Sequence, residues 1–265
     1  MSQHLPPVRR PARPSRALLS RLVAAADGCE RSFSVTASGV EDRVLFFLEH
    51  DAGAAALLRE AAQEMELPET LLKSWEAARP GADALGLALR SDGASVRLYT
   101  QYWEVLVARL RQGDPGDMPL YAGFKALPDG STRIDRYMPV VAAPREVYMP
   151  PLREALQSLD LDPLAIEQAL GPLTPERCIF TRTEGAGRNS WLTTLRRARL
   201  KPGRVTAMLA GLTQQARLAE AAACATRAPL IHVAGGEDAQ KGPFTTLYFE
   251  ITAAEAEAAL SPMVS

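Results

Sequence analysis

The stretch Cys29–His50, CERSFSVTASGVEDRVLFFLEH, predicts two antiparallel strands joined by a turn, and it decides the fold. Side chains alternate across a strand, so Phe33 lies on one face of the first strand and Glu30 on the other. In the return strand, Arg43 shares its face with Leu45. A sheet packs one apolar face against helices, so the face that carries Glu30 and Arg43 is either exposed to solvent or lines a cavity.

The same arrangement of strand, turn and strand recurs four more times. Turn signals lie near residues 92, 130, 186 and 238, and the segments between the hairpins have mostly helical periodicity. We expect helices at 16–26, 52–67, 68–79, 104–113, 144–160, 163–173 and 204–227, and a short one after residue 251. The helix at 144–160 should break or restart at Pro150 and Pro151. Five hairpins separated by helices form a structural repeat without a sequence repeat.

Ten antiparallel strands with helices between the hairpins can close into a barrel with the helices outside, which removes the exposed sheet edges. One face of every strand then points into a lumen, and about ten strands leave room there for a ligand. Basic and aromatic side chains alternate onto the expected inner faces. They are Arg43, Arg97, Lys125, Arg133, Arg182, Tyr99, Tyr137, Phe180, Trp191, Tyr248 and His232.

Composition limits the possible partners. The 265 residues include 30 Lys plus Arg and 31 Asp plus Glu, so no bulk charge attracts nucleic acid or an anionic membrane. No window approaches 18 apolar residues, and three scattered cysteines fit a reducing compartment. We therefore expect a cytoplasmic monomer with no nucleic-acid or membrane partner. Residues 1–15 should form a flexible Pro- and Arg-rich tail, and residues 16–265 a single domain.

Motifs of several other enzyme classes are absent from the sequence. It contains no DDxxD-type acidic motif, GxxxxGK[ST] or HExxH, no GxSxG, and no GxGxxG after a strand. This argues against a helical terpene synthase, a P-loop NTPase, a zincin and an α/β-hydrolase. No metal ligated tightly by the protein itself is expected.

Several segments together resemble the ABBA-type prenyltransferases. These are the order of five strand pairs, CERSFSV followed by RVLFFLE, the GFKALPDGSTRIDRY hairpin, and the strands CIFTRTE and TTLYFE. Within that family the chain is most similar to the compact cyanobactin-type peptide prenyltransferases, over about residues 16–252. The resemblance implies an α+β fold, the ABBA (PT) barrel, in which ten antiparallel strands form five hairpins in a central barrel surrounded by α-helices.

The resemblance also implies an activity. Such enzymes move a dimethylallyl or geranyl group from its diphosphate to an electron-rich acceptor, here a side chain of a ribosomally made and possibly cyclic peptide. Matching positions make Glu30 the acceptor contact and catalytic residue. Arg43, Arg97, Lys125 and Arg182 would bind the diphosphate, with Mg²⁺ bound through the diphosphate itself. An allylic carbocation would be shielded by Tyr99, Tyr137, Phe180, Trp191, Tyr248 and His232.

Two departures from the family pattern leave alternatives open. Tyr99 and Gln101 stand where further basic residues are expected, and Thr193 and Thr194 where tyrosines are common. One alternative is an inactive barrel of the same fold that binds a peptide or a hydrophobic ligand. The other is a prenyltransferase that acts on a small aromatic compound. Outside the lumen, the arginines of LRRARLKPGR, including Arg196, are expected to form a solvated cluster.

Overall fold

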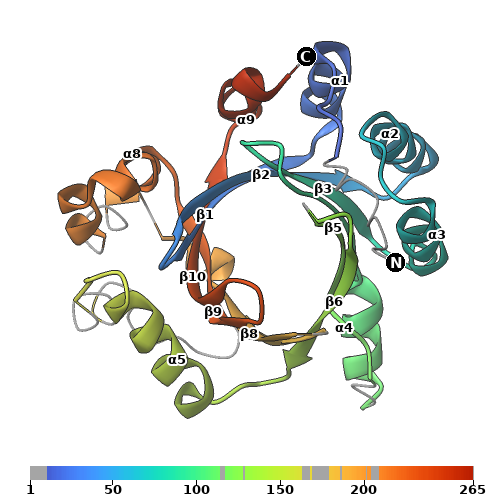
Figure 1. The fold of residues 1–265 in the computed structure, drawn as a ribbon. Helices are drawn as coiled ribbons and strands as arrows, with labels where there is room; N and C mark the ends of the chain where they lie inside the picture. Colours follow the sequence, from blue (N-terminus) through green and yellow to red (C-terminus); the bar gives the residue numbers. More distant parts are fainter. Residues whose placement is uncertain are drawn as a thin grey trace, which may run out of the picture.

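Ten antiparallel strands close into one barrel in the computed structural model (Figure 1). It describes residues 11–113, 117–127, 129–162, 168, 179–185, 187–200, 202–203 and 209–264. Each strand pairs with its sequence neighbours, and the first strand also pairs with the last. The strands are β1 (Gly28–Thr36), β2 (Gly39–Glu49), β3 (Ala84–Arg90), β4 (Val96–Gln101), β5 (Tyr121–Ala126), β6 (Thr132–Val140), β7 (Ile179–Glu184), β8 (Arg188–Thr194), β9 (Leu230–Asp238) and β10 (Gly242–Ile251). The expected barrel of five hairpins is confirmed.

Helices surround the barrel on the outside (Figure 1). They are α1 (Arg16–Ala25), α2 (Ala52–Glu64), α3 (Glu69–Ala78), α4 (Trp103–Arg111), α5 (Arg145–Gln157), α8 (Ala219–Arg227) and α9 (Ala253–Leu260). Short 3-10 turns lie at Arg196–Ala198, Ala210–Gln214, Ala216–Leu218 and Ser261–Met263. None of the helices in the described ranges is long and apolar enough to cross a membrane.

The apolar core lies between the outer face of the barrel and the helices. Phe33, Phe46 and Phe249 point outward from their strands and are almost fully buried, and Phe33 meets Phe249 edge to face at 6.1 Å. Trp75 of α3 is fully buried and donates its indole N–H to the Tyr99 carbonyl at 3.2 Å. Because the apolar residues of each strand face the helices, the small and polar residues are left to face the lumen.

Two expected helices differ from the observed ones. The helix α5 continues through Pro150 and Pro151, because each proline removes only one backbone N–H while Tyr148, Met149 and Leu152 hold the helix against the barrel.

The expected long helix at 204–227 is wrong for the part that the structure describes: residues 210–218 form two 3-10 turns, and only Ala219–Arg227 is α-helical. Gly211 packs there so closely that a Cβ would lie 3.1 Å from the Asp160 carbonyl oxygen. The expected helix at 163–173 lies, except for residue 168, outside the described residues.

Candidate functional site

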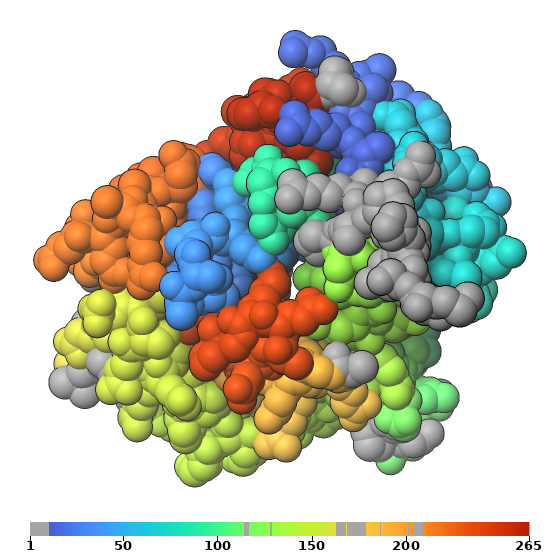
Figure 2. Space-filling model, in the orientation of Figure 1, coloured from blue at the N-terminus to red at the C-terminus, as the bar shows by residue number. Residues whose placement is uncertain are grey.

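Basic side chains converge inside the barrel near the end where the hairpin turns lie. A small cavity of about 30 Å³ is lined by Arg43, Arg97, Lys125, Arg133, Arg188 and Lys241. Among the described residues only two carboxylates line it, Glu41 and Asp238. In Figure 2 the hairpin of β9 and β10, in orange-red, lies across the front of the barrel. The hairpin end of the lumen is therefore strongly cationic, as the sequence predicts for Arg43, Arg97 and Lys125.

Lys125 is the least compensated of these basic side chains. It is 4% exposed, it stands between Arg97 and Arg133 in the cross-strand register, and no described residue forms an ion pair with it. Burial and the neighbouring charges of Arg97 and Arg43 lower the pKa of Lys125 to about 5. The amine is therefore neutral at pH 7 in the empty barrel. A bound anion would favour its protonated form.

A belt of tyrosines lies beside the cations. Arg97 donates to the hydroxyl groups of Tyr99 at 3.0 Å and Tyr137 at 2.8 Å. The rings of Tyr99 and Tyr137 are 6.5 Å apart, and Tyr121 meets Tyr137 edge to face at 6.2 Å. Gly123 makes room for this packing, because a Cβ there would lie 3.1 Å from both Arg97 Cδ and Tyr99 Cε1. The belt offers π faces next to the cationic end of the lumen.

A buried carboxylate lies nearer the other end of the barrel. Arg196 Nη2 donates to Glu30 Oε1 at 2.8 Å, and His232 Nε2 lies 3.4 Å from the same oxygen. The other imidazole nitrogen of His232 is 3.0 Å from Thr194 Oγ1. Burial alone would raise the pKa of Glu30, but His232 and Arg196 outweigh it and hold the pKa below its ordinary value. Glu30 is thus ionised at neutral pH and held at a fixed place.

Tyr248 and His232 extend the aromatic lining toward Glu30. Their rings meet edge to face at 5.6 Å. Tyr248 of β10 stands opposite Ser32 of β1 and His232 of β9 in the strand register, and all three lie on the inward faces of their strands. Tyr99, Tyr137, Tyr248 and His232 therefore lie in the lumen, where the sequence placed them.

The expected lumen positions of Arg182, Phe180 and Trp191 are wrong. Their neighbours Thr181 and Thr183 are the inward, buried residues of β7, whereas Arg182 is exposed on the outer surface. Phe180 and Trp191 stack at 6.0 Å in the outer layer, under the helices. Phe180 follows the apolar-outward rule of this barrel, and Arg182 shares its face because the side-chain period is two.

Three further residues near the site were not identified from the sequence as candidates. Arg188 stands at the first position of β8, and Lys241 lies in the turn before β10. At a strand end and in a turn, the alternation of side chains does not show which residues point inward. Arg196 was expected in a solvated cluster, yet it bridges Glu30 and Glu250.

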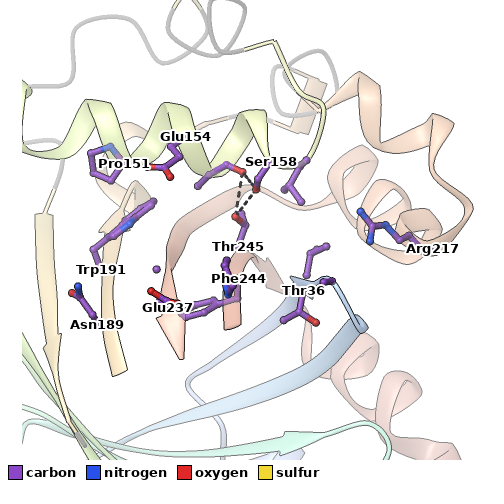
Figure 3. Close-up of a pocket in the computed structure, with 16 residues that line it drawn as sticks. Thr36, Pro151, Glu154, Ser158, Asn189, Trp191, Arg217, Glu237, Phe244 and Thr245 are labelled. Carbon is purple, nitrogen blue, oxygen red and sulfur yellow. Dashed lines mark hydrogen bonds between the residues drawn. The ribbon is translucent and has the colours of Figure 1, made fainter. Parts of the chain in front are cut away.

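A larger chamber lies outside the barrel wall. It has a volume of about 650 Å³ between α5 and the strands β8, β9, β10 and β1 (Figure 3). Trp191, Glu154 and Glu237 line it, and Phe244 borders both this chamber and the lumen cavity. The Phe244 ring lies 4.9 Å from the Arg188 guanidinium, at the boundary between the two cavities.

The acidic residues of the lumen do not suit a metal ion. No group of three His, Cys, Asp or Glu side chains in the described part of the chain could hold one. Glu41 is paired with Lys241, Arg90 and Arg43, and Asp238 with Arg133.

Comparisons with known proteins identify the fold. No family model matches the chain, and no curated protein sequence matches it significantly. Among solved structures, the PriB binary complex with product diphosphate is 17% identical with a TM-score of 0.55, covering 96% of this chain and 86% of that one.

The 5-dimethylallyl tryptophan synthase from Streptomyces coelicolor, in complex with DMASPP and Trp, is 16% identical with a TM-score of 0.52, covering 86% and 81%. The ternary complex of the prenyltransferase PriB with L-tryptophan and dimethylallyl thiolodiphosphate is 16% identical with a TM-score of 0.53, covering 85% and 80%. The chain therefore has the ABBA barrel fold.

Proposed function

We propose that this protein is a prenyltransferase that uses an allylic diphosphate, dimethylallyl or geranyl, as its donor. The observation that carries the proposal is the arrangement along the lumen. Buried basic side chains, among them Arg97 and Lys125, lie next to the belt of tyrosines, and a buried, ionised Glu30 lies beyond it. The two substrates of a prenyl transfer have the same order when they react: the anionic diphosphate, then the allylic carbon, then the acceptor that attacks that carbon.

The cations provide the driving force for the first step. The bond between the allylic carbon and the diphosphate oxygen breaks, and the electron pair leaves with the diphosphate. Guanidinium groups of Arg43 and Arg97 stabilise the charge that builds on that oxygen. Lys125 adds a further charge when the diphosphate raises its proton affinity.

The tyrosine belt and Glu30 act on the cation and the acceptor. The π faces of Tyr99 and Tyr137 stabilise the allylic carbocation and exclude water that would quench it. The acceptor's nucleophilic atom then bonds to the allylic carbon, and its proton leaves to restore neutrality or aromaticity. The Glu30 carboxylate orients the acceptor and takes up that proton.

Two acceptor classes follow from different observations. The sequence resemblance favours a side chain of a peptide, linear or cyclic. The structural likeness to complexes that contain tryptophan favours a small aromatic acceptor. Catalytic silence is the third possibility, in which the barrel only binds a peptide or a hydrophobic ligand.

The deciding experiment is an acceptor panel. The purified protein is incubated with dimethylallyl or geranyl diphosphate and with L-tryptophan, linear peptides or cyclic peptides, and products are read by mass spectrometry. Transfer to free tryptophan but not to peptides assigns the small acceptor, and the reverse result assigns the peptide. Lack of transfer, together with lack of pyrophosphate binding by calorimetry, contradicts the prenyltransferase proposal.

Three further expectations are also proposals. We propose that the chain works as a monomer, which size-exclusion chromatography with light scattering tests. We propose a cytoplasmic location, which cell fractionation tests. The expected use of Mg²⁺ through the diphosphate is tested by adding a chelator to the transfer assay, where full activity in excess chelator excludes it.

A further inference from the structure

Asp135 of β6 is the one fully buried carboxylate that the described residues place inside the cationic cluster. Its exposed fraction is 0%, and three guanidinium groups surround it. Arg133 Nε lies 3.1 Å from Oδ1, while Arg97 Nη2 and Arg188 Nη1 each lie 3.5 Å from Oδ2. The arginines come from three different strands, β4, β6 and β8. A single carboxylate thus joins side chains from opposite parts of the barrel wall.

Two glycines leave the space that this carboxylate and its arginines need. A Cβ at Gly185 would lie only 2.6 Å from Asp135 Oδ1. Gly123 stands opposite Asp135 in the register, and a Cβ there would lie 3.1 Å from Arg97 Cδ. The site therefore fits an aspartate closely. Even one methyl group beside it would move the carboxylate or its arginines.

Asp135 is only partly hydrogen-bonded, with Arg188 Nη1 donating to its Oδ2 at 3.5 Å. Oδ1 has no hydrogen-bond donor within the described ranges, and Arg133 Nε approaches it without hydrogen-bond alignment. A buried carboxylate with poorly aligned partners is costly, because the charge loses its hydration without full compensation. The nitrogens Arg97 Nε and Arg133 Nη2 are also buried and without a hydrogen-bond acceptor in the same part of the chain. The cluster has spare donors that a multiply charged anion would satisfy.

We propose that Asp135 is a positioning residue that holds Arg97, Arg133 and Arg188 at the spacing required by the departing diphosphate. This inference rests on the proposed function and adds a residue to it. Asp135 does not touch the reacting atoms. It gathers the guanidinium groups before the diphosphate binds, and a carboxyl group beside the site also limits how tightly an anion binds there. The result is a donor site ordered for reaction rather than for maximal affinity.

The test compares two substitutions of different kinds. Asp135→Asn keeps the shape of the side chain and removes its charge, so pyrophosphate should bind at least as tightly as it does to the wild type. The kcat should fall roughly 10- to 100-fold, because misplacement of the arginines by about 1 Å can cost 10²-fold in rate. Gly185→Ala keeps the charge and displaces the carboxylate, so kcat should fall without a gain in pyrophosphate affinity. Glu184→Gln, an exposed carboxylate paired only with Arg136 in the described structure, is the matched control and should match the wild type.

Each outcome has a distinct meaning. A purely structural role predicts that kcat and pyrophosphate affinity fall together, in proportion to the loss of folded protein measured by circular dichroism, and this result would overturn the inference. An unchanged kcat in both variants would overturn it as well. If Asp135→Asn does not fold, Gly185→Ala alone decides by its kcat. Failure of the proposed function looks different, because the wild-type protein itself then neither binds pyrophosphate nor transfers a prenyl group.

Discussion

Replacing Lys125 by methionine should stabilise the empty protein and weaken its binding of diphosphate. Methionine keeps the length of the side chain and removes the amine. In the folded protein the pKa of Lys125 is lowered to about 5 from an ordinary 10.5, mainly by burial and then by Arg97 and Arg43. The unfolded chain therefore binds a proton that the folded chain does not, and this difference opposes folding throughout the interval between those two pKa values.

The magnitude follows from the linkage between protonation and folding. Each pH unit below 10.5 costs about 1.36 kcal/mol, so keeping Lys125 neutral costs about 5 kcal/mol at pH 7 and about 2 kcal/mol at pH 9. The contribution of Lys125 to the free energy of unfolding of the wild type rises with pH between about 5 and 10.5, because the unfolded state binds more protons than the folded state in that interval. Lys125→Met should raise the free energy of unfolding by up to these amounts, and its advantage should shrink as pH rises.

Two assays measure the effect. Urea unfolding at pH 7 and pH 9 gives the stability difference, with the exposed Lys73→Met, 71% exposed in its side chain, as the matched control expected within about 0.5 kcal/mol of the wild type. Calorimetry of pyrophosphate binding in two buffers of different ionisation enthalpy gives the protons taken up. The wild type should take up close to one proton more than Lys125→Met. A less stable Lys125→Met with the same proton uptake would refute the reasoning.

Four further predictions concern three residues at the lumen and one on the outer surface of the barrel. Arg97→Met should weaken pyrophosphate binding roughly 10- to 100-fold, because a charge-assisted hydrogen bond contributes about 1.5–3 kcal/mol. If Arg97→Met binds pyrophosphate as tightly as the wild type, Arg97 is not part of the diphosphate site. Glu30→Gln should keep pyrophosphate binding and slow prenyl transfer by roughly 10²- to 10⁴-fold. Arg182→Ala should leave pyrophosphate affinity and transfer rates unchanged, because Arg182 is exposed outside the barrel. A loss of pyrophosphate affinity in this variant would show that Arg182 does bind the diphosphate. Arg196→Ala should move the acidic limb of the pH profile of kcat/KM to higher pH, because Arg196 helps to lower the pKa of Glu30. An unshifted limb would show that Glu30 is not the group that takes up the proton.

The fold was predictable from the sequence because alternation and turn signals repeat along the chain. Phe33 and Phe249 mark the outward face of their strands, so Glu30 and Tyr248 are placed inward by period two alone. The inward positions of Arg43, Arg97 and Lys125 follow in the same way.

The errors have a physical origin in one strand and in the hairpin ends. In β7, IFTRTE, Phe180 and Arg182 share one face, while Ile179 and two threonines share the other. Each face therefore holds one apolar residue and the sequence marks neither as the outer one; an outward Phe180 carries Arg182 outward with it. Arg188 and Lys241 lie at the end of a strand and in a turn, where alternation stops. The link between Arg196 and Glu30 spans 166 residues and depends on the closed barrel, which no local pattern encodes.

The most direct test of the account is a crystal structure of the protein with dimethylallyl thiolodiphosphate bound. The account predicts diphosphate oxygens within hydrogen-bond distance of Arg43, Arg97 and Lys125, and the dimethylallyl group against the rings of Tyr99 and Tyr137. Binding of the diphosphate in the chamber under α5, or at the surface near Arg182 with the lumen unchanged, would contradict it.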